Sequence, residues 1–470
     1  MTAGRPARLV PVPALFILLL VGACAPVASP TPSGSASVAT PDATRAAAAT
    51  PVSSADPSAS NSPSPLPSLS GGPRASASVS PSADASASAP ASVAPSVAPS
   101  RAPSVAPTLP PPAAPAVVAH DPRKFGFAAK GMTNEVLAFV TRDQIDYAVE
   151  SMDWDVVSTV AYFSLTATGE GSIERNDAWR AWNSAAMSRL IEKAHANGTK
   201  VVISLERFSW SPAQSAVSAA ALSTGERRGR LAREIAAEVV RRAVDGVNVD
   251  FEPIPPGQKE EFTHFIRTLR RELDRVRPGS QLTFCVIGHH DTYDVAGATG
   301  PDGADAVYLM GYHYAGTWSE AANSTAPMGG PRYDVVDTVV SLLDQVERHE
   351  LIVGVPYYGH VWPTAGSGRN AGTDGEGFDV PLHRAIDLAD RHGLNYDETE
   401  QVAWVPYRSQ PCAGCPSRWF QLYFDDARAS GHKWAWIKRN KLLGTGIWTI
   451  GFEGAPGPHD EVLRGVFLAR

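Results

Sequence analysis

The sequence contains no cluster of basic residues and no long hydrophobic run. Its 470 residues include 41 lysines and arginines against 48 acidic residues, which gives a formal net charge of −7. Because binding to a phosphate backbone needs clustered cations, we expect no nucleic-acid partner and a neutral one instead. The apolar run at residues 14–21 is much shorter than the roughly 20 residues that a membrane-spanning helix needs.

The stretch from residue 25 to residue 118 lacks Phe, Trp, Tyr, Lys and Glu, and consists almost entirely of Ala, Ser, Pro, Thr and Val. A segment of this composition cannot bury enough apolar surface to fold. We therefore expect residues 24–119 to be a disordered linker. As a coil it would reach on the order of 50 Å, and further in a polyproline-like conformation.

Residues 1–23 have the pattern of a bacterial lipoprotein signal. Basic residues precede the apolar run, and small residues lead to Cys24. The segment Val21–Cys24 resembles a lipobox, in which the signal is removed and the cysteine becomes a lipidated N-terminus. This predicts a protein on the extracellular face of a bacterial membrane, held there by the lipid at Cys24 through two or more acyl chains. An ordinary signal peptide cleaved nearby would instead give a secreted protein.

Beyond about His120, strands rich in aromatic residues alternate with amphipathic helices, which predicts a parallel sheet. Eight strands are the number that closes a barrel, so we expect residues 120–470 to form a monomeric α/β domain, a (β/α)8 TIM barrel. The candidate strands are residues 124–129, 156–165, 200–205, 244–252, 281–288, 306–313, 351–359 and 444–451.

The segments between these strands differ in what they predict. After the fourth strand, apolar residues recur every three or four positions from Phe262 to Val276, which predicts an amphipathic helix. No convincing helical pattern joins the fifth strand to the sixth. The stretch between the seventh and eighth strands is far longer than a βα loop, so we expect a small α+β insertion at about residues 360–435.

The fourth strand carries the strongest sign of chemistry. Residues 245–252 read Asp-Gly-Val-Asn-Val-Asp-Phe-Glu, so strand alternation places Asn248, Asp250 and Glu252 on one face. Buried polar groups are costly unless they serve a purpose. Glu252 ends the strand, at the rim where barrel enzymes place their active sites. A lone acid there could simply cap backbone groups or form an ion pair, but three aligned polar groups favour catalysis.

This strand resembles the signature of glycoside hydrolase family 18, the chitinase and endo-N-acetylglucosaminidase family. Residues 310–312, 354–359 and 446–448 resemble its sixth-, seventh- and eighth-strand motifs, and residues 423–427 with Lys433 are most similar to its branch of bacterial spore-cortex and cell-wall hydrolases. The resemblance implies hydrolysis of β-1,4-linked N-acetylglucosamine glycan, either chitin or peptidoglycan, without a cofactor.

The family mechanism is a substrate-assisted exception to two-carboxylate glycoside hydrolysis. It implies that Glu252 is the general acid, that Asp250 orients the acetamido group of the sugar and that Tyr312 hydrogen-bonds its oxygen. Trp448 would form the floor under the sugar ring. The resemblance adds Asn248 to the catalytic group and places the remaining substrate-binding residues at Phe127, Phe163, Met310 and His313.

Three positions depart from the family pattern. The family often has Asp where this chain has Asn248, and a neutral amide should leave Asp250 ionised more readily than a second carboxylate would. His313 stands where an acid is usual, which affects the pH profile. The third strand ends with Glu206 in place of the glycine that is common in chitinases, which sets this chain apart from typical chitin degraders.

Two other readings of the site compete with hydrolysis. His289, His290 and His313 could suggest a metallohydrolase, but the first strand offers no His-x-His pair, so we expect no metal. Lectin-like members of the family bind glycan without cleaving it. They usually lack the acid, so retention of Glu252 with Asp250 favours an enzyme.

The chain has only four cysteines. Cys412 and Cys415 could form half of a zinc site, but the chain offers no second pair of cysteines. In an exported protein a disulfide within this short loop is the better interpretation.

Overall fold

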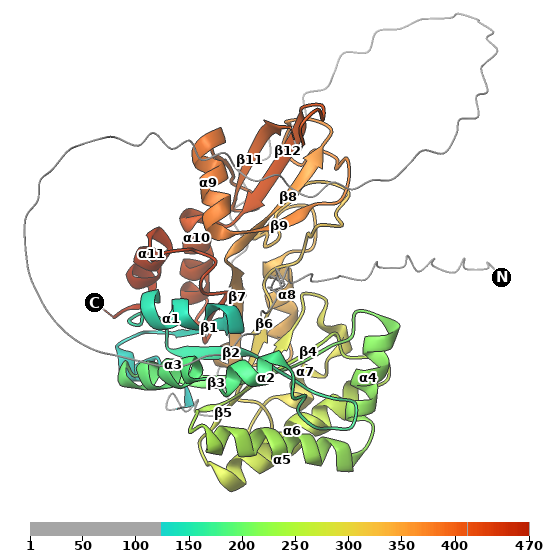
Figure 1. Cartoon of the computed structure of the whole chain (residues 1–470), viewed down its shortest axis with the longest axis vertical. Coiled ribbons are helices and arrows are strands. Elements are labelled where there is room, and N and C mark those ends of the chain that lie inside the picture. The colour runs from blue at the N-terminus through green and yellow to red at the C-terminus, as the bar shows by residue number, and fades with distance from the viewer. Residues whose placement is uncertain (1–123, 411, 470) are drawn as a thin grey trace, which may run out of the picture.

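A closed barrel of parallel strands forms the centre of the protein. The computed structural model describes residues 124–410 and 412–469, so the expected signal, Cys24 and the expected linker lie outside the described residues. Hydrogen bonds join the strands in the order β1-β13-β7-β6-β5-β4-β3-β2, and β2 pairs with β1 to close the ring. Figure 1 shows the barrel in the lower half of the view, with a second sheet above it.

The barrel strands agree with seven of the eight candidate segments, and the expected (β/α)8 TIM barrel is confirmed. Most of their residues are buried, because helices cover the outer face and side chains fill the interior. The strands are β1 (Glu135–Thr141), β2 (Thr159–Thr166), β3 (Lys200–Phe208), β4 (Gly246–Glu252), β5 (Gln281–Val286), β6 (Ala306–Leu309), β7 (Leu351–Pro356) and β13 (Gly444–Trp448).

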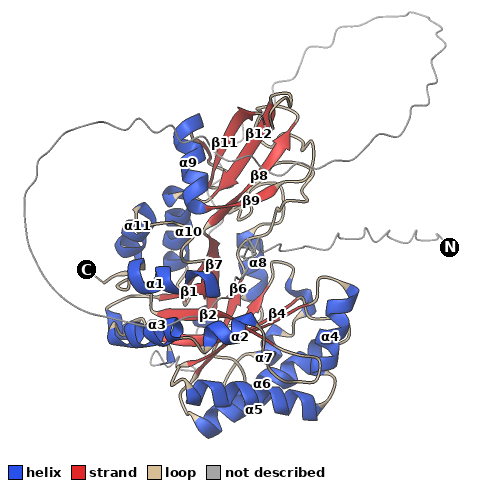
Figure 2. Ribbon diagram, in the orientation of Figure 1, coloured by secondary structure: helices blue, strands red, loops and turns tan. Residues whose placement is uncertain are grey.

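Helices surround the barrel (Figure 2). The predicted amphipathic helix is α6, and its apolar stripe lies against β4, where Phe251 packs on Phe265 and Phe262 with ring centroids 5.8 and 6.0 Å apart. The helices of the barrel are α1 (Ile145–Ser151), α2 (Asp177–Trp182), α3 (Ala185–Ala196), α4 (Pro212–Leu222), α5 (Gly225–Arg241), α6 (Lys259–Val276), α7 (Val295–Ala298), α8 (Val335–Leu342), α10 (Ala427–Arg439) and α11 (Pro458–Phe467).

The prediction of a first strand at residues 124–129 is wrong. That segment is irregular and ends in a short 3-10 turn, whereas β1 lies further along the chain and pairs with both β13 and β2. The cause is Gly126, which passes so close to the chain that a Cβ there would lie 2.3 Å from the carbonyl oxygen of Ser158. Ser158 directly precedes β2, so this segment crosses the amino-terminal end of the barrel.

The connection from β5 to β6 holds no long helix, as the sequence indicated. It contains a 3-10 turn and the four-residue helix α7. Asp294 precedes α7, and its side chain accepts a hydrogen bond from the backbone N–H of Gly297. Tyr293 of this connection is buried and donates a hydrogen bond to the backbone oxygen of Phe251 on β4. The barrel is therefore irregular next to the strand that carries the acids.

The insertion between β7 and β13 is a five-stranded antiparallel sheet in the order β10-β11-β12-β8-β9. Its elements are β8 (Tyr358–Thr364), β9 (Phe378–Pro381), α9 (Leu382–His392), β10 (Asn395–Asp397), β11 (Val402–Ser409) and β12 (Arg418–Phe424). A single residue, Tyr357, separates the end of β7 from the start of β8. The following helix, α10, packs on α11 and the barrel strands, so it belongs to the barrel layer.

Within residues 124–410 and 412–469, no helix has both the length and the apolar character that crossing a membrane would require.

Candidate active site

The polar row on β4 points into the barrel. Asn248 is fully buried, and its side chain donates a hydrogen bond to Thr283 Oγ1 at 2.9 Å and accepts one from Cys285 Sγ at 3.4 Å. Asp250 is 3% exposed, and its Oδ1 atom has no hydrogen-bond partner among the described residues. Glu252, at the end of the strand, is partly open to solvent. The row therefore runs from a fixed amide in the core to a carboxyl group at the rim.

The two carboxyl groups of this row hold their protons unusually strongly. Burial raises the pKa of Asp250 to about 7, the nearby Glu206 carboxylate adds to the rise, and the neighbouring Cys285 thiol opposes it. Burial also raises the pKa of Glu252 well above its usual value, and the charges of Asp250 and Glu206 raise it further. Because the pKa of Glu252 is raised, the site can present an acid at the rim near neutral pH.

The expectation that Asn248 would leave Asp250 readily ionised misses a second acid. Glu206 pairs in register with Asp250 across the β3–β4 ladder and is 7% exposed. Side chains of paired residues in parallel strands point to the same face, so this carboxyl group lies beside Asp250 inside the barrel. The sequence marked Glu206 as unusual, but it did not reveal which acid it would face.

Aromatic rings form one side of the site. Trp448 ends β13, and its ring centroid lies 4.7 Å from that of Phe163 on β2 and 5.3 Å from that of Phe139 on β1. Phe208, at the end of β3, lies 6.5 Å from Phe163. Trp448 stays partly exposed, so one face of a large ring is open at the rim. Phe163 and Trp448, which the sequence analysis names separately as substrate-binding residues, therefore lie side by side.

Phe127 does not belong to this group, and its expected role in substrate binding is wrong. It lies before β1, in the segment that crosses the amino-terminal end of the barrel, whereas Glu252 lies at the carboxyl-terminal end. Phe139 occupies the first-strand position in its place. The continuous apolar run of β1 could have indicated this, because strands buried on both faces lack alternation.

Tyrosines fill the space under the rim on the β6 side. Tyr312 is 5% exposed and its ring lies 6.1 Å from that of Tyr358, while Met310 is 8% exposed and packs in the core. Burial raises the pKa of the Tyr312 hydroxyl well above its usual value, so it remains a hydrogen-bond donor. The ring of Tyr308 fills the interior of the barrel, and Gly446 leaves room for it. A Cβ atom at Gly446 would lie 2.0 Å from the Tyr308 ring.

His313 contacts the insertion. The ring centroid of His313 lies 6.1 Å from that of His360 on β8. The backbone of His313 has a φ of 65°, and its N–H donates a hydrogen bond to Thr325 Oγ1 at 3.0 Å. His360 in turn hydrogen-bonds Asp379 on β9 at 2.6 Å. The His313 side chain is exposed to solvent on one side. The groups packed around the ring reduce its solvation, which lowers its pKa, and the neighbouring His360 lowers that pKa further. It is therefore neutral at physiological pH, where an acid would be charged.

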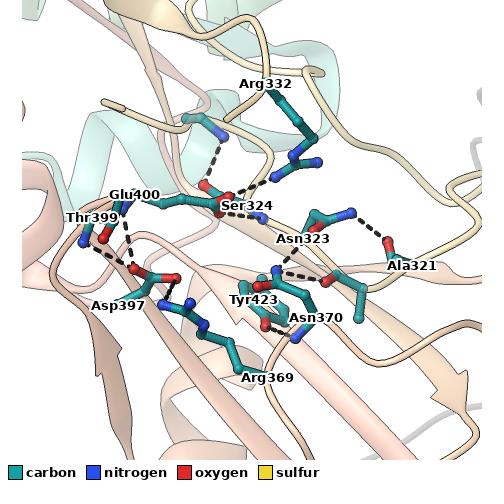
Figure 3. Close-up of polar contacts among 12 residues, drawn as sticks. Ala321, Asn323, Ser324, Arg332, Arg369, Asn370, Asp397, Thr399, Glu400 and Tyr423 are labelled. Atoms are coloured by element: carbon teal, nitrogen blue, oxygen red, sulfur yellow. Dashed lines mark hydrogen bonds and ion pairs between the residues drawn. The ribbon is translucent and has the colours of Figure 1, made fainter. Parts of the chain in front are cut away.

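The loop that follows β6 is tied to the insertion by polar contacts (Figure 3). Arg332 forms an ion pair with Glu400 at 2.8 Å, and the Asn370 side chain donates to Asn323 at 2.7 Å. The Tyr423 hydroxyl accepts a hydrogen bond from the Asn370 backbone at 2.9 Å. The ion pair and the Asn370–Asn323 hydrogen bond hold the insertion against the loop that carries His313.

The histidines after β5 are not grouped as metal ligands. His289 stacks on Tyr333 with centroids 5.2 Å apart, and His290 Nε2 lies 3.3 Å from Ser341 Oγ. In the described part of the chain, no set of three or more His, Cys, Asp and Glu side chains is placed to hold a metal ion. Cys412 and Cys415, between β11 and β12, are joined by a disulfide.

A closed parallel barrel with a glutamate of raised pKa at the carboxyl-terminal rim, an aspartate two residues before it and a tryptophan beside it is typical of the class of barrel glycosidases. Residues 119–453 match the model of the glycosyl hydrolases family 18, so the chain belongs to that family. Its glycoside hydrolase relatives include chitinases and cortex-lytic enzymes.

Two curated relatives illustrate the range of the family. The cortical fragment-lytic enzyme of Bacillus subtilis is 26% identical over 239 residues, which cover 47% of this chain and 50% of that protein. Chitinase 1 of Aphanocladium album is 23% identical over 346 residues, covering 62% of this chain and 74% of that protein. The chain spans about half the length of the Bacillus subtilis relatives that it matches.

Solved structures share the fold. The spore cortex-lytic enzyme SleL of Bacillus cereus superimposes with a TM-score of 0.56 at 17% identity, over 71% of this chain and 74% of that one. The chitinase-like agglutinin of Robinia pseudoacacia gives a TM-score of 0.60 at 18% identity, over 70% and 98%. The fold thus occurs both in a lytic enzyme and in an agglutinin.

Proposed function

We propose that this protein hydrolyses β-1,4-linked N-acetylglucosamine glycan by a substrate-assisted, retaining mechanism with Glu252 as general acid and base. The observation that carries the proposal is the pair on β4. Glu252 stands at the rim with a raised pKa, and Asp250 lies below it on the same face. Relatives named as chitinases and cortex-lytic enzymes support the same class of substrate.

In the first step, protonated Glu252 donates its proton to the glycosidic oxygen as the bond from that oxygen to the anomeric carbon breaks. The acetamido carbonyl oxygen of the same sugar attacks the anomeric carbon and forms a cyclic oxazolinium intermediate. Ionised Asp250 stabilises the positive charge that develops on the acetamido nitrogen. Tyr312 donates a hydrogen bond to the acetamido oxygen, and Trp448 packs under the ring.

In the second step, the carboxylate of Glu252 takes a proton from water, whose oxygen attacks the anomeric carbon from the side that the leaving group vacated. The oxazolinium ring opens, Glu252 is protonated again, and the anomeric configuration is retained. Since the nucleophile belongs to the substrate, hydrolysis is restricted to N-acetylated sugars. Asp250 works only when ionised and Glu252 only when protonated, which predicts a bell-shaped pH profile.

The test is to incubate the purified chain with chito-oligosaccharides and with peptidoglycan beside a Glu252→Gln variant. We expect wild type to release reducing ends from at least one substrate and the variant to release almost none. Comparison of the two substrates decides between chitin and peptidoglycan. If wild type binds glycan but releases no reducing ends, the protein is a lectin-like binder, and the hydrolase proposal fails.

We also propose that the protein is a monomer held at the outer face of the cell membrane by lipid on Cys24. The lipobox-like segment and the Pro- and Ala-rich stretch that follows it support this proposal. Cys24→Ala should release the protein from the membrane fraction, and light scattering should give the mass of one chain. Unchanged membrane retention of Cys24→Ala would rule out the lipid anchor.

A further inference from the structure

A third carboxyl group lies inside the barrel beside the two acids of β4. Glu206 on β3 is in register with Asp250, and Phe208 is in register with Glu252. Adjacent strands lie about 4.8 Å apart, with paired side chains on the same face. Glu206 is 7% exposed, and its Oε1 accepts a hydrogen bond from Thr166 Oγ1 at 2.5 Å. The buried acids of this site therefore come from two strands.

Asn248 cannot tune the charge of Asp250. Its amide does not titrate, and both ends of its side chain are engaged, by Thr283 and by Cys285. The position two residues before Asp250 on its own strand is therefore electrically neutral. Any carboxylate that adjusts the ionisation of Asp250 from the interior side must come from another strand, and Glu206 is in register to do so.

We propose that Glu206 is a positioning residue: the charge that it holds one strand away from Asp250 sets the pH range in which the Asp250–Glu252 pair works. The proposal rests on the proposed hydrolase function, because it gives Glu206 a role in that reaction. Glu206 touches neither substrate nor the bond that breaks. It acts through Asp250, which must be ionised while Glu252 is protonated.

Electrostatics support the direction of this effect. A negative charge on Glu206 raises the pKa of both Asp250 and Glu252. Burial raises the pKa of Glu206 itself, while the Thr166 hydrogen bond and the charge of Arg207 lower it and Glu174 raises it. Among the described residues, the other titratable groups that interact with these acids are Cys285 on β5, Tyr293 after it and Tyr308 on β6. Acids coupled in this way titrate as a group.

The sign of the expected change follows from charge removal. Glu206→Gln removes a negative charge, so Asp250 should ionise at lower pH, and the acidic limb of the activity profile should move down. Glu252 should also lose its proton at lower pH, so the alkaline limb should move in the same direction. The whole bell-shaped activity profile is therefore expected to shift to lower pH. A purely structural role would lower activity at every pH without moving either limb.

The experiment measures kcat/KM against pH on a chito-oligosaccharide with the full-length chain. Four variants are compared with wild type: Glu206→Gln, Glu206→Asp, Thr166→Val and Glu192→Gln. Glu206→Asp keeps the charge and should restore the wild-type limbs. Thr166→Val removes the hydrogen bond that favours the ionised form of Glu206, so its bell should move toward acid, by less than in Glu206→Gln. Glu192 is exposed on α3, so Glu192→Gln is the matched loss of one carboxylate from a screened position and should leave both limbs in place.

A titration that does not depend on activity separates this proposal from the proposed function. In the full-length chain labelled with 13C at aspartate carboxyls, the Asp250 signal is identified by its loss in Asp250→Asn. Its midpoint should fall in Glu206→Gln and stay unchanged in Glu192→Gln. An inactive wild type with that shift present would defeat the hydrolase function alone. The role of Glu206 would be overturned if wild type is active but Glu206→Gln changes neither the titration midpoint of Asp250 nor the limbs of the pH profile.

Discussion

The charge of Asp250 raises the pKa of Glu252, two residues further along the same face of β4. This relationship makes the two acids differ in function although both are carboxyl groups. In the proposed mechanism the upper one keeps its proton for the leaving group, whereas the lower one must give up its proton to stabilise the intermediate. Burial raises the pKa of both acids, and their mutual repulsion disfavours the state in which both are ionised, so one can stay protonated beside the other's charge.

The first prediction concerns Glu252. Glu252→Gln keeps the size of the side chain but cannot donate a proton, so kcat should fall on the order of 10²- to 10⁴-fold. Binding of chito-oligosaccharide, measured by calorimetry, should remain close to wild type because the contacts of the sugar with Trp448 and Tyr312 are unchanged. A variant that keeps more than a tenth of wild-type kcat would show that another group is the acid.

The second prediction concerns stability as a function of pH. The folded-state pKa of Asp250 is raised to about 7, against an unfolded value near 3.9. Between these values the folded state holds the extra proton, so the contribution of Asp250 to stability falls as pH rises and stays low above pH 7. Asp250→Asn should therefore raise Tm relative to wild type at pH 8 and change it little at pH 4.

The matched control for this stability measurement is Asp274→Asn, because Asp274 lies on the solvent side of α6. It should not gain stability at pH 8. If Asp250→Asn gave the same change in Tm at pH 4 and pH 8, the raised pKa of Asp250 would be contradicted.

The third prediction concerns the aromatic platform. Trp448→Ala removes the ring that contacts Phe163 and Phe139, so KM for oligosaccharide should rise and the free energy of unfolding should fall by about 3 kcal/mol. Trp448→Phe keeps a flat ring and should recover most of the binding. Steady-state kinetics and urea unfolding check both effects. An unchanged KM in Trp448→Ala would remove this residue from the substrate site.

The fourth prediction concerns the barrel axis. A Cβ at Gly446 would lie 2.0 Å from the ring of Tyr308, which fills the interior between β6 and β13. Gly446→Ala should therefore lower the free energy of unfolding by about 1–3 kcal/mol and displace Tyr308, with a loss of activity.

The control for Gly446→Ala is Gly366→Ala in the insertion, where an added Cβ would meet nothing within 4 Å. Urea unfolding should show no loss of stability there. Equal effects at the two positions would mean that Gly446 does not make room for the tyrosine.

Local patterns were sufficient for much of the fold. The period-two pattern of residues 246–252 placed the polar row on one face and Phe251 against α6, because side-chain direction in a strand depends only on position along it. The apolar spacing of α6 was equally local. The exception was the first strand, where Phe125-Gly126-Phe127 resembled alternation although Gly126 serves a close approach to Ser158.

The sequence by itself determined which strand carries the acids, which residue ends it and which family the chain resembles, since these depend on residues that are neighbours in the chain. Only the tertiary structure decided that Glu206 faces Asp250, that Phe139 stands beside Trp448 and that His313 contacts His360 of the insertion. The register between strands and the packing of an inserted sheet are set by contacts between distant segments. The charge environment of the site depends on those contacts, so it could not be read from the β4 motif alone.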